Sequence, residues 1–302
     1  MAMRLSLGVA FFSTLALAQA DPPARPAKPP ASLSAPSLSQ DQIRELIRKA
    51  ADNDMENDKK LRDYTYVERD EERKLDGKRE VKSTEVKTYD VMEIYGEQVQ
   101  KLIAKDDKPL SEKDTKKEDD KIQKLIDKRK DESPEDRKKR LEKEEKNREE
   151  DRQFVREVAD AYDYKFVGVE TIDGRENYVI DGEPKPGYAP QLKQARILPK
   201  FRYRAWIDKD ETQWKKVDIE CIDTVSWGWF IARVHKGSRI VIEQTRVNDE
   251  VWLPQHTSLK LDARVALLKQ FNMDLDMAYR DYKKFRTETK IIPGGEVLEQ
   301  QQ

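Results

Sequence analysis

The chain has 302 residues, a length that predicts one large domain or two small ones. Its 59 lysine and arginine residues nearly cancel its 60 aspartate and glutamate residues, giving a net charge of −1. A chain so close to neutrality has no overall field to attract nucleic acid or an anionic membrane surface. Charged residues make up 39% of the chain, well above the usual ~25%, so the excess must be concentrated locally.

The first 20 residues have the three parts of a secretory signal peptide. Arg4 supplies the positive charge, residues 5–17 form a short apolar core, and Ala18-Gln19-Ala20 is a small-x-small cleavage site. A membrane-spanning helix is disfavoured because the apolar stretch is shorter than the ~20 residues that a bilayer requires. We therefore predict an exported protein, periplasmic or secreted, that is soluble and has no membrane span after cleavage near Ala20.

The segment after the signal peptide changes from a linker to a helix. Residues 21–38 are rich in proline, alanine and serine and lack apolar periodicity, which predicts a disordered linker. Ser39 and Gln42 then form a capping box at the start of an amphipathic helix over residues 39–51. We expect the apolar side of this helix to lie on a sheet.

Strand patterns begin at Tyr64, and Asp76-Gly77 predicts a two-residue hairpin after the first strand. Further strands are expected over residues 81–86, 91–95 and 99–103.

Residues 105–152 interrupt the strands, and roughly three quarters of them are charged, with the two signs in balance. Ser133-Pro134 is a good helix start, with a serine N-cap and proline at the first position. Pairs such as Glu144 and Arg148 contribute only ~0.2–0.5 kcal/mol each, so we predict a helical or disordered insertion that is solvated rather than packed. It is either a mobile lid or interaction arm, or a charged surface excursion without a partner. Acidic residues interrupt every basic cluster, which disfavours nucleic-acid binding.

The strands resume at residue 162, and Asp173-Gly174 predicts a second hairpin, with one helical turn expected over 191–197. The run 201–285 alternates with period two, so one face of the sheet is apolar and the other is polar. The predicted strands of this run are 202–208, 213–224, 229–235, 239–247, 251–261, 264–271 and 273–289. An antiparallel sheet must cover its apolar face, either with protein or with a bound apolar molecule.

The aromatic and apolar residues of this run are the candidate ligand contacts. Trp227, Trp229 and Phe230 surround a predicted turn, where they are either a rim that touches lipid or an ordinary part of the core. The remaining candidates share one phase of the alternation: Leu261, Phe271, Met273, Leu275 and Met277.

Signals for catalysis are weak. The two histidines, His235 and His256, are distant in sequence and lack further ligands at a coherent spacing, so no metal site is predicted. The single cysteine, Cys221, excludes an intramolecular disulfide and is in phase with apolar neighbours. We find no phosphate-binding loop or nucleophile motif, and expect neither enzymatic activity nor a cofactor.

Three short blocks resemble a known family. Residues 204–208 (RAWID), 247–254 (VNDEVWLP) and 279–285 (YRDYKKF) are similar to segments of the outer-membrane lipoprotein-sorting (LolA/LolB/LppX-like) group, and more narrowly to its exported members. The resemblance covers residues 162–289. It implies an incomplete antiparallel β-barrel wrapped around a helical plug, with an apolar cavity for acyl chains.

We therefore predict an α+β fold, mainly antiparallel β, in which residues 39–302 form one carrier-like domain with the charged insertion at 105–152. The leading hypothesis is an exported, non-enzymatic carrier that binds lipid, an acyl chain or a lipoprotein. The alternative is a cell-envelope scaffold or adaptor that binds another protein through its charged arm.

Overall fold

The computed structural model describes residues 38–227, 232–265 and 269–285. The helices in this part of the chain are α1 (Gln40–Leu61), α2 (Glu112–Lys130), α3 (Pro134–Ala161) and the 3-10 helix η1 (Gln194–Lys200). The first strands are β1 (Tyr64–Leu75), β2 (Val81–Ile94), β3 (Glu97–Lys105), β4 (Lys108–Pro109), β5 (Tyr162–Ile172) and β6 (Arg175–Pro184). The others are β7 (Phe201–Asp208), β8 (Trp214–Cys221), β9 (Val225–Trp227), β10 (Ala232–Val234), β11 (Arg239–Val247), β12 (Val251–Val265) and β13 (Lys269–Lys284).

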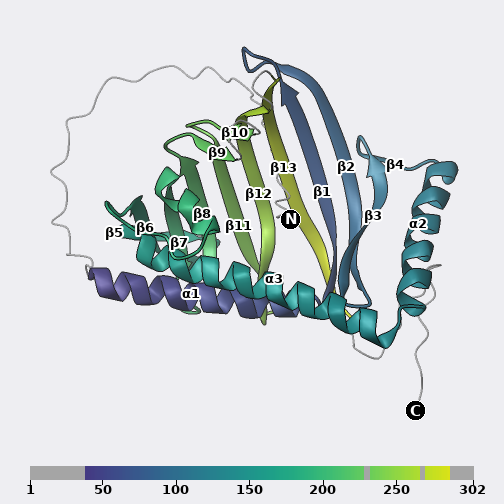
Figure 1. Ribbon diagram of the computed structural model, residues 1–302, viewed down its shortest axis with the longest axis horizontal. Helices are drawn as coiled ribbons and strands as arrows, with labels where there is room; N and C mark the ends of the chain where they lie inside the picture. Colours follow the sequence, from purple (N-terminus) through teal and green to yellow (C-terminus); the bar gives the residue numbers. More distant parts are fainter. Residues whose placement is uncertain (1–37, 228–231, 266–268, 286–302) are drawn as a thin grey trace.

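The described strands form one open, 13-stranded antiparallel sheet (Figure 1). Its order is β4-β3-β2-β1-β13-β12-β11-β8-β7-β6-β5, and β9 and β10 form a flap attached to β12. Most neighbours in the sheet are also neighbours in the sequence, but β1 pairs with β13. The predicted mainly antiparallel α+β fold is confirmed, as an open half-barrel.

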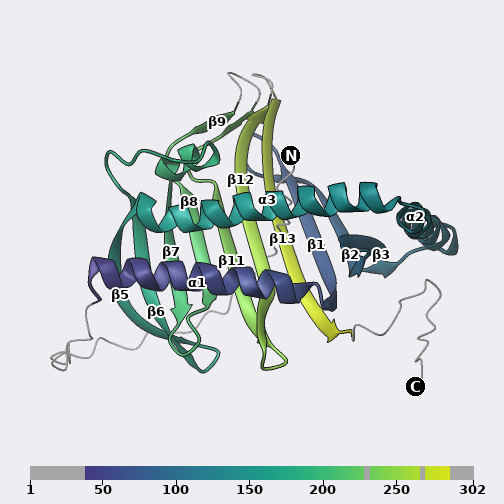
Figure 2. The same cartoon turned by 60° about the horizontal axis from the view of Figure 1, so that its bottom comes forward.

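Helices α1 and α3 run side by side, in opposite directions, across one face of the sheet (Figures 1 and 2). Two ion pairs connect them, Arg48 with Asp160 at 2.7 Å and Arg156 with Asp52 at 3.0 Å. We call the face beneath these helices the helix face and the opposite one the outer face. None of the helices in the described ranges has the length and hydrophobicity needed to cross a membrane.

Helix α1 begins where the sequence predicts and ends ten residues later than expected. The capping box is present, because the side chains of Ser39 and Gln42 each bond the other's backbone N–H. The extension is held by two asparagines: Asn53 donates to the carbonyl of Thr212 at 2.8 Å, and Asn57 donates to Gln213 Oε1 at 2.8 Å. The partners of both asparagines lie in the β7–β8 connection, so local sequence patterns could not predict this extension.

The main core lies between α1 and strands β5 to β8. Ile43 and Ile47 of α1 are 0% and 1% exposed, and they pack in one cluster with Ile180, Ala205 and Ile207 of the sheet. The predicted helical plug therefore has a filled core beneath its first turns.

The charged insertion folds as two helices and is less free than the sequence predicts. Ile122 of α2 is only 4% exposed, Lys101 of β3 pairs with Asp119 at 2.6 Å, and Arg129 pairs with Glu97 at 2.5 Å. Ser133 caps α3 as predicted. Helix α3 continues into the core cluster through Ala159 and Ala161, so part of the predicted insertion belongs to a long structural helix.

Several predicted boundaries are wrong. The expected break between 261 and 264 lies inside β12, where Asp262 pairs with Asn272, and the expected strand 229–235 is reduced to β10 within the described residues. The alternation of apolar and polar residues continues through residue 262, so the sequence pattern could not show where β12 ends. The first hairpin is also wider than two residues: Asp76 accepts hydrogen bonds from the backbone of Lys78 and Glu80.

Candidate functional site

The predicted apolar row lies on the helix face of the β12–β13 hairpin. Leu259 pairs with Leu275 and Leu261 with Met273, so these side chains are direct cross-strand neighbours. Gln244 of β11 belongs to the same face, and its Nε2 donates to Asp54 Oδ1 of α1 at 2.8 Å. Burial raises the pKa of that Asp54 carboxyl above its usual value.

These side chains are less buried than the core beneath α1. We define the apolar strip as the helix-face residues Ile240, Leu259, Leu261, Phe271, Met273 and Leu275. All of them except Met273 (9% exposed) are half-buried, whereas the isoleucines of the core are fully buried. The strip therefore keeps part of its apolar surface in contact with water.

The structure brings together five of the eight predicted contact residues. Leu261, Phe271, Met273 and Leu275 belong to the strip, and Met277 continues it as a fully buried neighbour of Thr257. Trp227 is in β9, whose partner β10 pairs with the far end of β12. Trp229 and Phe230 lie outside the described residues. A role for any of the eight in binding stays a prediction.

One part of the site was missed from the sequence, a row of carboxylates beside the strip. Strand β1 places Glu68, Asp70 and Glu72 directly opposite Tyr279, Met277 and Leu275 of β13. We call these three residues the acidic row. Their one-phase spacing was visible in the sequence, but the β1–β13 pairing that joins them to apolar residues was not.

Asp70 is the unusual member of the acidic row. Its Oδ1 atom is buried and has no hydrogen-bond partner, and within the described ranges its side chain forms no ion pair. Burial raises the pKa of Asp70 to about 7, an effect that the charge of Lys87 opposes. A buried acceptor without a donor costs about 1–3 kcal/mol, so this group favours a bound donor.

The outer face of the same strands is fixed by a charged triad. His256 Nε2 lies 2.8 Å from Asp276 Oδ2 and its Nδ1 lies 3.6 Å from Glu243 Oε2, so one histidine connects β11, β12 and β13. The hydrogen bond to Asp276, followed by that to Glu243, raises the pKa of His256 to about 9. The protonated imidazole therefore supports the strands that carry the apolar strip.

This triad predicts a pH-dependent loss of stability. The folded-state pKa of about 9 exceeds the ordinary 6.5, so the stabilisation is fully present below pH 6.5 and is lost as the pH rises through about 9. We expect His256→Gln to lower the free energy of unfolding by roughly 1 kcal/mol at pH 6, after allowance for solvent screening, and by less at pH 10. Urea unfolding of both proteins at the two pH values measures the difference. An equal effect at both would show that the imidazole charge is not involved.

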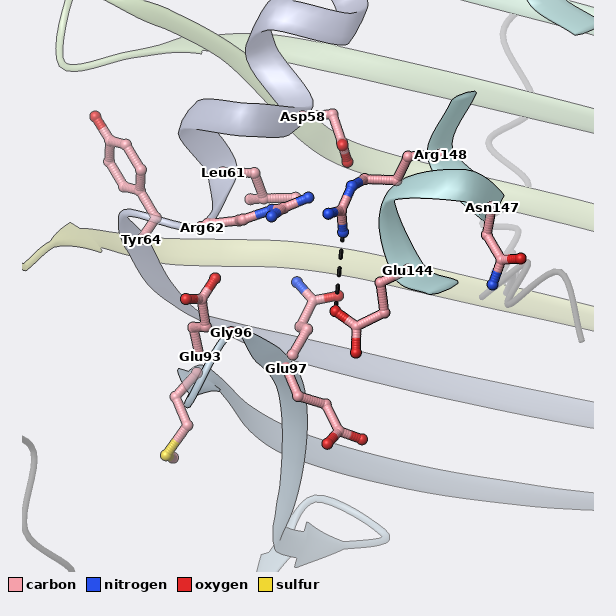
Figure 3. A pocket seen from close by; sticks show the side chains of 12 residues that line it. Asp58, Leu61, Arg62, Tyr64, Glu93, Gly96, Glu97, Glu144, Asn147 and Arg148 are labelled. Carbon is pink, nitrogen blue, oxygen red and sulfur yellow. Dashed lines mark ion pairs between the residues drawn. The ribbon is translucent and has the colours of Figure 1, made fainter. Parts of the chain in front are cut away.

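A pocket of about 340 Å³ lies where the end of α1, the β2–β3 turn and α3 meet (Figure 3). Arg62 enters it from the end of α1 and Arg148 from α3, the latter 3.9 Å from Glu144. Burial raises the pKa of Glu93, which also lines the pocket. Carboxylates and guanidinium groups alternate around this junction pocket, so it suits polar groups rather than an acyl chain.

A groove of about 550 Å³ on the outer face is lined by ion pairs across β6, β7, β8 and β11. Arg204 pairs with Asp181 at 2.5 Å and Arg202 with Glu220 at 2.8 Å. These charges are satisfied within the sheet and leave no group to recognise a ligand. In the described ranges, no group of three or more potential ligands is placed to hold a metal ion.

The sequence blocks that carry the family resemblance meet in a structural brace. Asp208, the last residue of the first block, accepts hydrogen bonds from Arg175 at 2.6 and 2.8 Å, and the guanidinium of Arg175 lies over the ring of Trp252 from the second block. Tyr282 of the third block donates to the carbonyl of Pro254 at 2.6 Å. These motif residues hold the sheet and do not form the apolar strip.

Comparisons with known proteins give remote similarities to solved structures. No family model matches the chain, and no curated protein matches it. A putative outer membrane lipoprotein-sorting protein domain from Vibrio parahaemolyticus is 10% identical, with a TM-score of 0.32 over 78% of this chain and 92% of that chain. A LolA superfamily protein from Nitrosomonas europaea is 9% identical, with a TM-score of 0.28 over 80% and 93%.

A DUF1329 family protein from Desulfovibrio piger is 11% identical, with a TM-score of 0.27 over 79% of this chain and 92% of that chain. Two of these three proteins carry names of the group that the three sequence blocks resemble. Similarities at this level carry no information on ligand or activity, which must come from the residues of this chain.

Proposed function

We propose that this protein is an exported, non-enzymatic carrier that binds the acyl chain of a lipid or lipoprotein on its apolar strip. The observation that carries the proposal is the partial exposure of five large apolar side chains on one sheet face, beside a core that is otherwise filled. Each methylene group removed from water there contributes about 0.8 kcal/mol, so a chain of several carbons binds through burial alone.

The test is a pair of matched substitutions on β12. Leu259 and Ser258 are adjacent but lie on opposite faces, and Leu259→Gln replaces an apolar contact of the bound chain by an amide. We expect Leu259→Gln to weaken binding of the neutral apolar fluorophore N-phenyl-1-naphthylamine about tenfold or more, because losing a leucine contact costs ~1.5–3 kcal/mol. Ser258→Gln should leave the affinity unchanged.

Native mass spectrometry of the protein purified after export provides the second readout. Stoichiometric lipid on the wild type, reduced in Leu259→Gln, is the expected result. A wild type that carries no lipid and binds no acyl probe would overturn the proposal.

The adaptor hypothesis is favoured by one feature, helix α2, which stands as an arm beside the β3–β4 edge of the sheet (Figure 1). Most of the lysine side chains on α2 are exposed there, where a partner protein has access to them. An adaptor has no use for the apolar strip, so Leu259→Gln would then leave every function of the protein intact.

A further inference from the structure

We propose that the carrier's ligand is an amphiphile with a protonated amine headgroup, which Asp70 binds while the chain lies on the apolar strip. This inference rests on the proposed function and specifies the chemistry of the ligand. It is carried by the place of Asp70 in the sheet, opposite Met277 and Lys87, and by its buried Oδ1 atom, which has no hydrogen-bond partner among the described residues.

The pairing of β1 with β13 brings charge and apolar surface into contact. Asp70 is directly opposite Met277, and Glu72 is opposite Leu275, which in turn pairs with Leu259 of the strip. Cross-strand neighbours of this kind have Cβ atoms about 4.5–5.5 Å apart. A chain lying on Leu259 and Leu275 therefore ends within reach of the Asp70 carboxylate.

The other carboxylates of this region already have partners, two of them lysines and one an amide. Glu72 pairs with Lys74 at 3.2 Å, and Glu85 of β2 pairs with Lys87 at 2.9 Å. Glu68, 3% exposed, accepts a hydrogen bond from the neutral amide of Gln100 at 2.5 Å. Asp70 thus lies on a face where the lysines are engaged by other acids, and its buried Oδ1 is left for a ligand.

An amine supplies what this position lacks. A primary ammonium group has three N–H donors and a positive charge, so it can satisfy Oδ1 and compensate the buried carboxylate together. A fatty-acid carboxylate at the same position would instead meet Asp70, Glu68 and Glu72 and be repelled. Charge complementarity therefore selects an amine-headed ligand over an anionic one.

The protonation of Asp70 makes this selection depend on pH. Burial raises its pKa to about 7, while Lys87 of β2 lowers it and Glu72 of its own strand raises it. The other titratable groups near it are Glu68 and Tyr66 on β1, Tyr89 and Glu85 on β2, and Tyr279 on β13. The charged carboxylate predominates at pH 8 and the neutral acid at pH 5.5, so amine preference should be greater at pH 8.

The experiment compares three probes of equal chain length, dodecylamine, 1-dodecanol and dodecanoate, below their micellar concentrations. Each displaces the neutral fluorophore N-phenyl-1-naphthylamine from the wild type at pH 8 and low salt. We expect dodecylamine to bind at least about tenfold more tightly than dodecanol, as a charge-assisted hydrogen bond implies, and dodecanoate to bind most weakly. Asp70→Asn should abolish the amine preference and leave the dodecanol affinity unchanged.

Asp274→Asn, on the outer face of β13, is the matched control and should keep the preference. Asp70→Asn also removes a carboxylate whose burial is unfavourable, so its thermal midpoint at pH 8 should not fall, which separates lost recognition from lost folding. The wild type can also be tested without mutation: its preference for the amine should be smaller at pH 5.5 than at pH 8. Equal affinities for amine and alcohol at pH 8 would overturn this inference while leaving the carrier intact. No displacement by any probe would overturn both.

Discussion

Replacing Arg175 with alanine is expected to destabilise the fold by about 3 kcal/mol at neutral pH, since it leaves a buried carboxylate without its cation. The Asp208 side chain is 1% exposed. Burial alone would raise the pKa of Asp208, but the hydrogen bond from Arg175 and those from the backbone of Glu211 and Asp210 outweigh it and keep the pKa below its usual value. Alanine also removes the cation over the ring of Trp252.

Denaturant unfolding of Arg175→Ala at several pH values measures this effect. A lowered pKa means that the ionised Asp208 stabilises the fold above about pH 4 and that this contribution is lost as the pH falls, so the gap between the two proteins should narrow in acid. Arg202→Ala is the control, because that side chain is 49% exposed and its pair with Glu220 is worth at most about 1 kcal/mol. Equal losses of unfolding free energy in Arg175→Ala and Arg202→Ala would show that Arg175 does not stabilise the fold through Asp208.

The second large effect is expected at the centre of the core. Ile47→Ala removes a side chain that is 1% exposed between α1 and the sheet, and such truncations cost about 2–5 kcal/mol through lost burial and the cavity left behind. For a domain of this size we expect the thermal midpoint to fall by roughly 10 °C.

Val81→Ala is the matched control for Ile47→Ala. Val81 is also a branched aliphatic residue but is 56% exposed at the start of β2, so its truncation should change the free energy of unfolding by less than about 0.5 kcal/mol. Calorimetry or circular dichroism compares the two variants. A small effect of Ile47→Ala would mean that α1 is a detachable cover and not part of the core.

Local signals were sufficient to predict several elements from the sequence. The capping box at Ser39, the Ser133-Pro134 start and the Asp173-Gly174 hairpin depend only on neighbouring residues, and each is present. In the hairpin, Asp173 and Gly174 both have positive φ, at 50° and 77°, as a tight turn between twisted strands requires. Such features need no knowledge of the rest of the chain.

Contacts between distant segments could not be predicted in the same way. The strip was found as one phase of an alternation, but whether Leu259 is covered depends on where α1 ends, and that is set by Asn53 and Asn57 binding the β7–β8 connection. The burial of Asp70 could not be predicted, because a carboxylate in a strand pattern normally faces water. Its burial follows from the pairing of β1 with β13, which no local pattern specifies.

The pairing of β1 with β13 also determines at what stage of synthesis and folding the site can form. Asp70 and Met277 are roughly 200 residues apart, so their contact closes a long loop and carries a large entropic cost. A chain emerging in order from the ribosome holds the acidic row long before its apolar neighbours are made. Any ligand that requires both can be bound only after β13 has been synthesised and has paired with β1.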